Sequence, residues 1–453
     1  MADSASKLLL RFAPMIYGPT ALFGIGEGAV IPLIPVVAAR LGANLATSGL
    51  IASALVIGQL CGNIPAGWLV ARVGERLTMA IAGTIALAGA MGLIYSPSLG
   101  LLAASVFLIG ICAAAFGLAR HAFMTTKVPF SFRARALALL GGTFRFGMFA
   151  GPFIAALLLG LTGTTASAAW CLAVCLIACV LLVLLGPDPE RVLEAEAAQA
   201  EQAEQAEQAE QAEQADADAR RARSLQQPAD TGEAITGNIR LPGDADQPVS
   251  NNAPRSEGVF RTMVRFRRVL ARLGIAAASL AAVRSARQVV LPLWGLSIGL
   301  DAHTISLVVG VAGAIDFALF YASGQVMDRL GRLWAVMPAM LLMGSGFVAL
   351  ALTHDLPDAA MWFAMFAAVI GVGNGLSSGI LLTLGADVAP QHDPAPFLSS
   401  WRTLNDAGGA AAPMLFSALA AVSTLGVATG AMGVIALLGA LGFWRWVPMF
   451  VRR

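Results

Sequence analysis

Six ionisable side chains lie deep inside apolar stretches of the chain, and they are the residues best placed for chemistry. They are Glu27, Arg145, Arg284, Arg287, Asp316 and Asp406. An ionised group at the centre of a bilayer costs roughly 2.5–3.5 kcal/mol on the insertion scale, so six facing lipid would cost on the order of 15–20 kcal/mol. We therefore expect these groups to face one another or a wet cavity, as in a protein that carries solutes across a membrane.

The composition indicates an integral membrane protein. The 453 residues are 57% hydrophobic and only 12% charged, with a mean hydropathy of +0.75, whereas soluble domains carry about 25% charged residues. A helix needs about 20 apolar residues to cross the bilayer. That requirement predicts twelve spans, at 13–38, 47–70, 77–95, 100–120, 137–160, 166–186, 274–299, 305–327, 333–352, 359–384, 397–420 and 425–449.

The placement of Lys and Arg predicts the orientation of the spans, because cytoplasmic loops carry an excess of these residues. The short loops on one side hold only Arg40. The other side holds Arg72, Arg76, Arg120, Lys127, Arg133, Arg135, Arg329, Arg332, Arg452 and Arg453. We predict a multi-pass protein of the cell (inner) membrane with both termini and the central loop in the cytoplasm. The run after Lys7 and Arg11 is too long for a signal peptide and is taken as the first span.

Residues 187–265 differ in composition and separate an amino-terminal bundle, 1–186, from a carboxy-terminal bundle, 266–453. The triplet Glu-Gln-Ala runs five times from Glu201 to Ala215. A period of three drifts about 60° per triplet on a helix, so the alanines form no stripe. We expect a solvated helical or disordered linker, with docking of a partner as the alternative. The basic run from Arg261 to Arg272 favours contact with anionic headgroups and not with nucleic acid, because it adjoins a span.

The two bundles contain an internal repeat. Residues Gly67 to Arg76 and Gly324 to Arg332 nearly superimpose at an offset of 257, and the segments at 147–152 and 409–413 correspond at an offset of 261. Such symmetry is typical of transporters that are built from two related halves.

On these segments the chain resembles the major facilitator superfamily. The second copy is similar to that family's loop motif G-x-L-x-D-R-x-G-R, with Val326 for the Leu, whereas the first copy has Ala71 where the family has Asp. Gly147, Gly151 and Pro152 resemble the fifth-helix motif of the family's antiporters, although Ala155 and Ala156 replace the usual glycine pair.

The resemblance implies an all-α membrane protein of twelve helices in two pseudo-symmetric six-helix bundles, which rock about a midplane site. It also implies a conformational latch in which Asp328 pairs with the amino terminus of span five, near Ser131 and Arg133. Simple topology marking is the alternative for its arginines. The latch residues are Gly67, Arg72, Gly74, Gly324, Asp328, Arg329, Gly331 and Arg332.

The helix neighbours implied by the family suggest partners for the buried charges. We expect Arg145 to pair with Asp316 across spans five and eight. Asp406 is expected to meet Gln59, or else Arg402 within its own helix. Glu27 is expected to face Arg284, with Arg287 one turn along. Each pair has a purely structural alternative.

Two sets of candidate site residues follow. Glu27, Asp316 and Asp406 are candidates for proton coupling; Glu27 lies between Gly26 and Gly28, which leave room for water or substrate. Arg284 and Arg287, three residues apart on one helix face, could hold a carboxylate or phosphate bidentately. The substrate-binding candidates are Arg284, Arg287, Arg145, Asn374, Phe23 and Trp294, with plain packing as the alternative for the two aromatic residues.

The leading hypothesis is a proton-coupled exporter of small apolar or amphiphilic molecules. Its rivals are an importer or exchanger of organic anions and, in another class, a membrane sensor that does not transport. The sequence has no Walker loop and no His-Glu-x-x-His motif, and its five cysteines lie in apolar runs without metal-site neighbours. We expect no enzyme activity, no cofactor, no metal and no nucleic acid. The expected partners of this monomer are the lipid bilayer, a small-molecule substrate and protons.

Overall fold

The computed structural model describes residues 17–126, 130–186, 264–390 and 395–451. Within these ranges the chain is helical and has no strand. The predicted linker falls outside the described residues except for its last two positions. The side chains of Ser131 and Arg133, on which the expected latch depends, also fall outside them.

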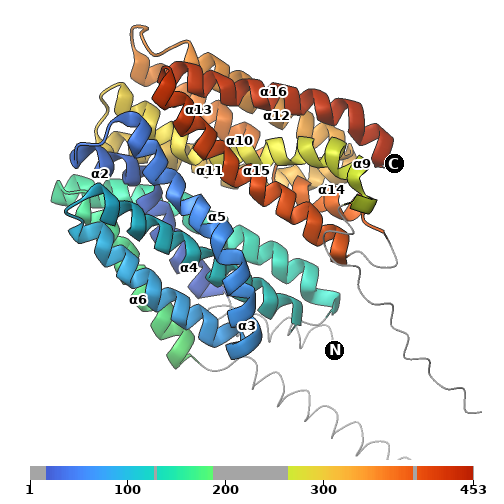
Figure 1. The fold of residues 1–453 in the computed structure, drawn as a ribbon, viewed down its shortest axis with the longest axis horizontal. Helices are drawn as coiled ribbons and strands as arrows, with labels where there is room; N and C mark the ends of the chain where they lie inside the picture. The colour runs from blue at the N-terminus through green and yellow to red at the C-terminus, as the bar shows by residue number, and fades with distance from the viewer. Residues whose placement is uncertain (1–16, 127–129, 187–263, 391–394, 452–453) are drawn as a thin grey trace, which may run out of the picture. The chain divides into compact units, whose positions relative to one another are not determined.

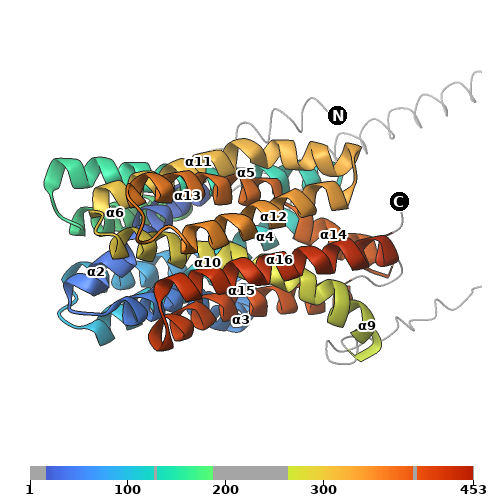
Figure 2. The same cartoon turned by 90° about the horizontal axis from the view of Figure 1, so that it is seen from above.

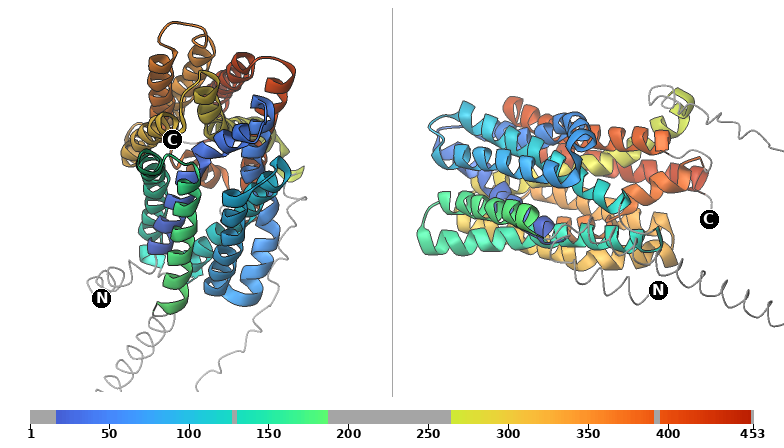
Figure 3. Two further views of the ribbon diagram at one scale, coloured as in Figure 1. Left: turned by 90° about the vertical axis from the view of Figure 1, so that its left-hand side faces the viewer. Right: turned by 90° about the horizontal axis from the view of Figure 1, so that it is seen from below.

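The helices of the first half begin with Tyr17–Arg40, which runs through η1 (Ile31–Leu33) into α2 (Ile34–Arg40). They continue with α3 (Leu45–Tyr95), α4 (Leu99–Thr126), α5 (Phe130–Thr162) and α6 (Ala166–Leu185). The second half comprises α9 (Arg267–Val269), η2 (Leu270–Gly274), α10 (Ile275–Ser297), α11 (Ala302–Arg329), α12 (Arg332–Ala351), α13 (Ala359–Leu376), α14 (Ile380–Val388), α15 (Ala395–Val422) and α16 (Leu425–Phe450). The end-on view in Figure 3 separates the blue-to-green helices from the yellow-to-red ones.

The protein is an all-α membrane protein with twelve transmembrane helices. By length and composition, ten described segments can cross a membrane, and α13 with α14 count as one of them. The long α3 contains two spans, because Gly74 interrupts it with φ 79° and ψ 171°. Together with α15 this makes twelve, as predicted. Gly331 adopts nearly the same backbone, φ 95° and ψ 168°, between α11 and α12, so the repeat at an offset of 257 is confirmed at the level of backbone conformation.

Helix neighbours agree with those implied by the family resemblance. Within the first half α3 packs on α4 and α6; within the second half α10 packs on α15 and α16, and α12 on α13 and α16. The main contacts between the halves join α5 to α11 and α3 to α15 (Figures 1 and 2). These are spans five and eight, and spans two and eleven.

Small residues allow the first helix and α5 to cross in backbone contact. A Cβ on Gly147 would lie 2.7 Å from Ile25 N, and one on Gly28 would lie 2.9 Å from Met148 O. Gly24 and Gly151 are equally enclosed by the opposite helix. The antiporter-like glycines of α5 thus have a packing role: two Gly-x-x-x-Gly faces meet, which is a common way for membrane helices to approach closely.

Candidate functional site

A cavity of about 620 Å³ lies between the two halves. Its wall on α5 runs from Gly141 to Met148, and on α10 from Ala281 to Gln288. On α4 it continues to His121, near the end of that helix, and on α15 it begins at Arg402, near the start of that helix. The cavity therefore extends from the middle of the helices toward one end of the bundle, where α4 finishes and α15 begins.

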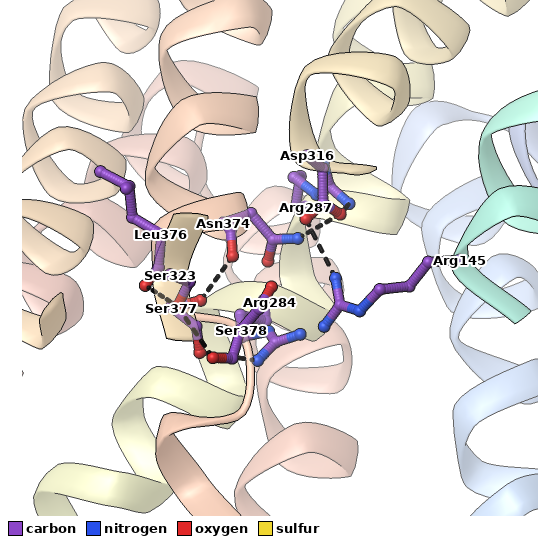
Figure 4. Close-up of polar contacts among 9 residues, drawn as sticks. All are labelled: Arg145, Arg284, Arg287, Asp316, Ser323, Asn374, Leu376, Ser377 and Ser378. Carbon is purple, nitrogen blue, oxygen red and sulfur yellow. Dashed lines mark hydrogen bonds and ion pairs between the residues drawn. The ribbon is translucent and has the colours of Figure 1, made fainter. Parts of the chain in front are cut away.

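Asp316 is the centre of an ion cluster on this wall (Figure 4). Arg145 Nη1 lies 3.0 Å from Asp316 Oδ1, and Arg287 Nη2 lies 3.5 Å from Asp316 Oδ2. Asn374 Nδ2 donates a hydrogen bond of 2.6 Å to Asp316 Oδ2. The predicted pair of Arg145 and Asp316 is therefore confirmed, and it joins α5 of the first half to α11 of the second.

Arg284 has a different partner from the one we expected. Its Nη1 donates to Ser377 O at 3.4 Å, where the tenth span breaks between α13 and α14. Gly379 there has φ 77°, and Ser323 Oγ lies 2.7 Å from Leu376 O and 2.9 Å from Ser378 O. Arg284 thus lies at the carboxyl end of α13, which carries partial negative charge. The expected contact between Glu27 and Arg284 is wrong.

Glu27 belongs to a polar network inside the first half. It is 4% exposed and accepts a hydrogen bond of 3.0 Å from Gln59 Nε2. Arg120, on α4, acts on it electrostatically. The Arg120 guanidinium lies over the rings of Phe144 and Phe116, with its Cζ 4.9 and 5.5 Å from their centroids. Gln59 lines the cavity and Glu27 lies behind it.

Sequence reasoning missed the role of Arg120, which it took for a residue at the membrane boundary that marks topology. The signal for a buried position was present, because α4 and its apolar pattern continue beyond Arg120 to Met124, which is 1% exposed. Arg120 is itself only 9% exposed, and its Nε and Nη1 have no hydrogen-bond partner among the described residues.

Asp406 lines the cavity and pairs within its own helix. Its Oδ2 lies 3.6 Å from Arg402 Nε. The predicted contact between Asp406 and Gln59 is therefore wrong, because Gln59 bonds to Glu27, and the intrahelical alternative is confirmed.

Two aromatic candidates lie in the core and not on the described wall of the cavity. Phe23 is 2% exposed and stacks on Phe116 with ring centroids 4.6 Å apart. Trp294 is fully buried and meets the ring of His354 edge-on at 5.2 Å. The prediction that Phe23 and Trp294 bind substrate is therefore wrong, and the alternative holds: both are packing residues. Asn374 does line the cavity.

The latch segments make contacts within their own halves. Arg332 Nε donates to Asp387 Oδ2 at 2.9 Å, while Asp328, whose side chain is 81% exposed, lies 3.7 Å from Arg332. In the first half, Arg76 donates to Val183 O, Leu184 O and Gly186 O at 2.7–2.9 Å. Among the remaining latch residues, the Arg72 guanidinium lies over the Trp68 ring, 5.0 Å from its centroid. A Cβ added at Gly67 or Gly324 would meet no close neighbour. Arg329 is the last residue of α11.

The cavity wall carries more positive than negative charge. Arg145, Arg284, Arg287 and Arg402 line it against Asp316 and Asp406, with neutral polar groups on Gln59, Asn63, Gln288, Asn374 and Asn405. Over the described residues, no group of three or more His, Cys, Asp and Glu side chains could hold a metal ion. The arrangement suits an anionic or zwitterionic ligand.

Two six-helix halves around a central polar cavity define a membrane transporter. The chain belongs to the Major Facilitator Superfamily, whose model matches residues 19–413. No curated protein sequence gives a significant match to it.

Solved structures share its fold at low identity. A POT family transporter in complex with a thioalcohol-conjugated peptide has a TM-score of 0.71 at 12% identity, with 98% of this chain and 97% of that chain covered. A POT family transporter in complex with 5-aminolevulinic acid has a TM-score of 0.69 at 12% identity, with the same coverage. The xylose transporter XylE from E. coli, in a partially occluded inward open conformation, has a TM-score of 0.61 at 16% identity, with 96% and 99% covered.

Proposed function

We propose that this transporter carries small organic anions, by alternating access of its two halves and in symport with protons. The observation that supports this most directly is the excess of guanidinium groups at the end of the cavity that lies in the middle of the helices. Asp316 is contacted by Arg145 and Arg287, and Arg284 lies nearby on a backbone carbonyl. A substrate carboxylate would supply the missing negative charge.

The charge of the wall favours an anion over the apolar substrate expected from the resemblance to antiporters. Guanidinium groups bind carboxylates through two parallel hydrogen bonds, which adds both energy and orientation. Four arginines against two aspartates repel a lipophilic cation. The glycines of the antiporter-like motif are accounted for by helix crossing, so they carry no information about export.

Asp316 is the proton site in this proposal. It lies on the cavity wall and bridges α11 to Arg145 on α5. A proton on Asp316 weakens this bridge between the halves and leaves Arg145 and Arg287 short of negative charge. The substrate anion then binds to these two arginines, and the anion and the proton together carry no net charge. Asp406, with its partner in the same helix, and Glu27, behind Gln59, are less suited to this role.

The cavity faces the end of the bundle whose loops carry most of the positive residues. By the positive-inside rule we assign this end to the cytoplasm, and we propose an inward-facing transporter of the inner membrane with both termini in the cytoplasm. The 5-aminolevulinic acid bound by one structural neighbour is itself a small carboxylic acid, which agrees with the substrate class proposed here.

Transport by purified protein in proteoliposomes tests the proposal. The probes are labelled 2-oxo acids, which stay ionised and leak little, and the lipophilic cation tetraphenylphosphonium. We expect exchange of a 2-oxo acid, and its accumulation when the outside is acidified. Arg287→Gln should reduce the exchange rate more than tenfold, whereas Arg445→Gln, an exposed arginine on α16, should not. Proton-driven movement of the cation without movement of any 2-oxo acid would overturn the anion proposal.

A further inference from the structure

A second, smaller cavity lies on the other side of the Asp316 cluster. Its volume is about 60 Å³. On α5 its wall runs from Arg145 to Pro152, on α10 from Arg287 to Pro292, and on α11 from Val309 to Asp316. The two cavities share the lining residues Arg145, Met148, Arg287, Gln288 and Asp316. They are therefore stacked along the helices, with the ion cluster as their common wall.

The two cavities differ in chemistry. Beyond the shared residues, the lining of the smaller cavity is apolar: it consists of Gly28, Ile31, Pro32, Phe149, Pro152, Leu291, Pro292, Val309 and Gly313. All its charged lining groups belong to the shared wall. A ligand that reaches Arg145 or Arg287 from the large cavity thus contacts their guanidinium groups. The apolar small cavity lies next to that contact, on the far side of the ion cluster.

We propose that the small cavity is the subsite for an apolar substituent of the transported anion. The carboxylate binds Arg145 and Arg287, and an unbranched or singly branched alkyl group enters the chamber behind them. The substrate class is therefore a small amphiphilic carboxylate and not a fully polar one. This inference rests on the proposed anion transport and adds the part of the substrate that the arginines do not recognise.

The size of the chamber limits the alkyl group. One water needs about 10–15 Å³ of cavity space, so 60 Å³ accommodates roughly four to six water-sized groups. We expect alkyl groups of about three to five carbons to fill it. Each buried methylene should tighten binding about fourfold until the chamber is full, after which further carbons should weaken binding.

Competition by a homologous series tests the subsite. In exchange-active proteoliposomes, inhibition by straight-chain 2-oxo acids with one to seven alkyl carbons should strengthen to a maximum near the fourth carbon and then weaken. Val309→Ala and Leu291→Ala enlarge the chamber from two sides and should each shift the maximum by one or two carbons toward longer acids. Leu438→Ala, on the exposed face of α16, is the matched control and should leave the maximum in place.

The outcomes separate this inference from the proposed function. Inhibition that does not depend on chain length, or a maximum that neither variant moves, overturns the subsite while anion transport stands. If no 2-oxo acid of any length exchanges or competes, the proposed function itself fails. Misfolding cannot produce the gain of affinity for long acids that we expect in Val309→Ala. Val309 is also less buried than Leu291, so Val309→Ala still tests the subsite if Leu291→Ala does not fold.

Discussion

Gln59 Nε2 donates a hydrogen bond of 3.0 Å to Glu27 Oε1, and this bond connects the wall of the large cavity to a charge buried behind it. Arg120 acts on the same carboxylate, while its Nε and Nη1 lack hydrogen-bond partners among the described residues. Glu27 is therefore a buried carboxylate that partly compensates the charge of Arg120. The three side chains form one network within the first half of the protein.

Glu27→Gln is expected to destabilise the protein, because it leaves Arg120 buried without its counter-charge. The two side chains act on each other through space and not as a contact ion pair, so we expect a loss below the roughly 3–5 kcal/mol that breaking a buried contact pair costs. Arg120→Gln alone should also destabilise, whereas the double variant should regain much of the loss because both charges are gone. Thermal unfolding of the purified protein in detergent measures all four members of this cycle. Additive losses would show that the two residues act independently.

Asp316→Asn is expected to preserve the exchange of 2-oxo acids and to abolish their proton-driven accumulation. The amide cannot take up a proton, and it leaves Arg145 and Arg287 permanently free for an anion. Exchange of 2-oxo acids should persist and lose its dependence on pH, while accumulation under a pH gradient should fall at least tenfold. Asp355→Asn, in the exposed loop before α13, serves as the control carboxylate. If accumulation survives in Asp316→Asn, the coupling proton is held elsewhere.

Gly151→Ala is expected to destabilise the crossing of α5 and the first helix. The added Cβ would overlap Ile25 O and would lie 2.5 Å from Ala29 N and 2.7 Å from the carbonyl carbon of Gly28. These are backbone atoms, so relief requires the helices to separate, and overpacking of this kind costs about 1–3 kcal/mol or more.

Gly141→Ala on the same helix is the matched control for Gly151→Ala. A Cβ at Gly141 would meet no atom within 4 Å. Because Ala favours a helix over Gly by up to about 1 kcal/mol, this change should be neutral or stabilising in the same thermal assay. Equal unfolding temperatures for the two variants would contradict a tight crossing at Gly151.

Much of the architecture could be predicted from residue patterns alone. The twelve spans follow from hydropathy, and the offset of 257 correctly relates Gly74 to Gly331, which share one backbone conformation. The pair of Arg145 and Asp316 could be predicted because the repeat and the helix neighbours together leave few partners for a buried charge.

The partners of Glu27 and Arg284 could not be predicted from symmetry. The break in the tenth span exposes Ser377 O to Arg284, and a helix break of this kind depends on tertiary contacts such as those of Ser323. The feature of the sequence that indicates this helix break is the run Ser377-Ser378-Gly379 after Gly375. Arg120 was missed for a simpler reason: it falls at the last position of the predicted fourth span, where an arginine normally marks the membrane boundary.

Asp301, outside the spans, provides a pH-dependent contribution to stability. It caps α11 by accepting hydrogen bonds from Thr304 Oγ1 at 2.6 Å and His303 N at 3.1 Å. The hydrogen bond from Thr304 is the main reason that the pKa of Asp301 lies below its usual value. A carboxyl with a lowered pKa stabilises the fold fully above the unfolded-state pKa, about 3.9, and this contribution is lost as the pH falls through the lower pKa of the folded state.

Asp301→Ala should therefore cost about 1 kcal/mol at pH 7, the usual value of such a cap, and less as the pH is lowered below about 4. Thermal unfolding between pH 3 and 7 gives the difference between this variant and the parent protein. Asn44 caps α3 in the same way, by accepting from Thr47 N at 2.8 Å, but its amide does not titrate. Asn44→Ala should consequently show a cost that is independent of pH, and a parallel decline in both variants would exclude Asp301 ionisation as the cause.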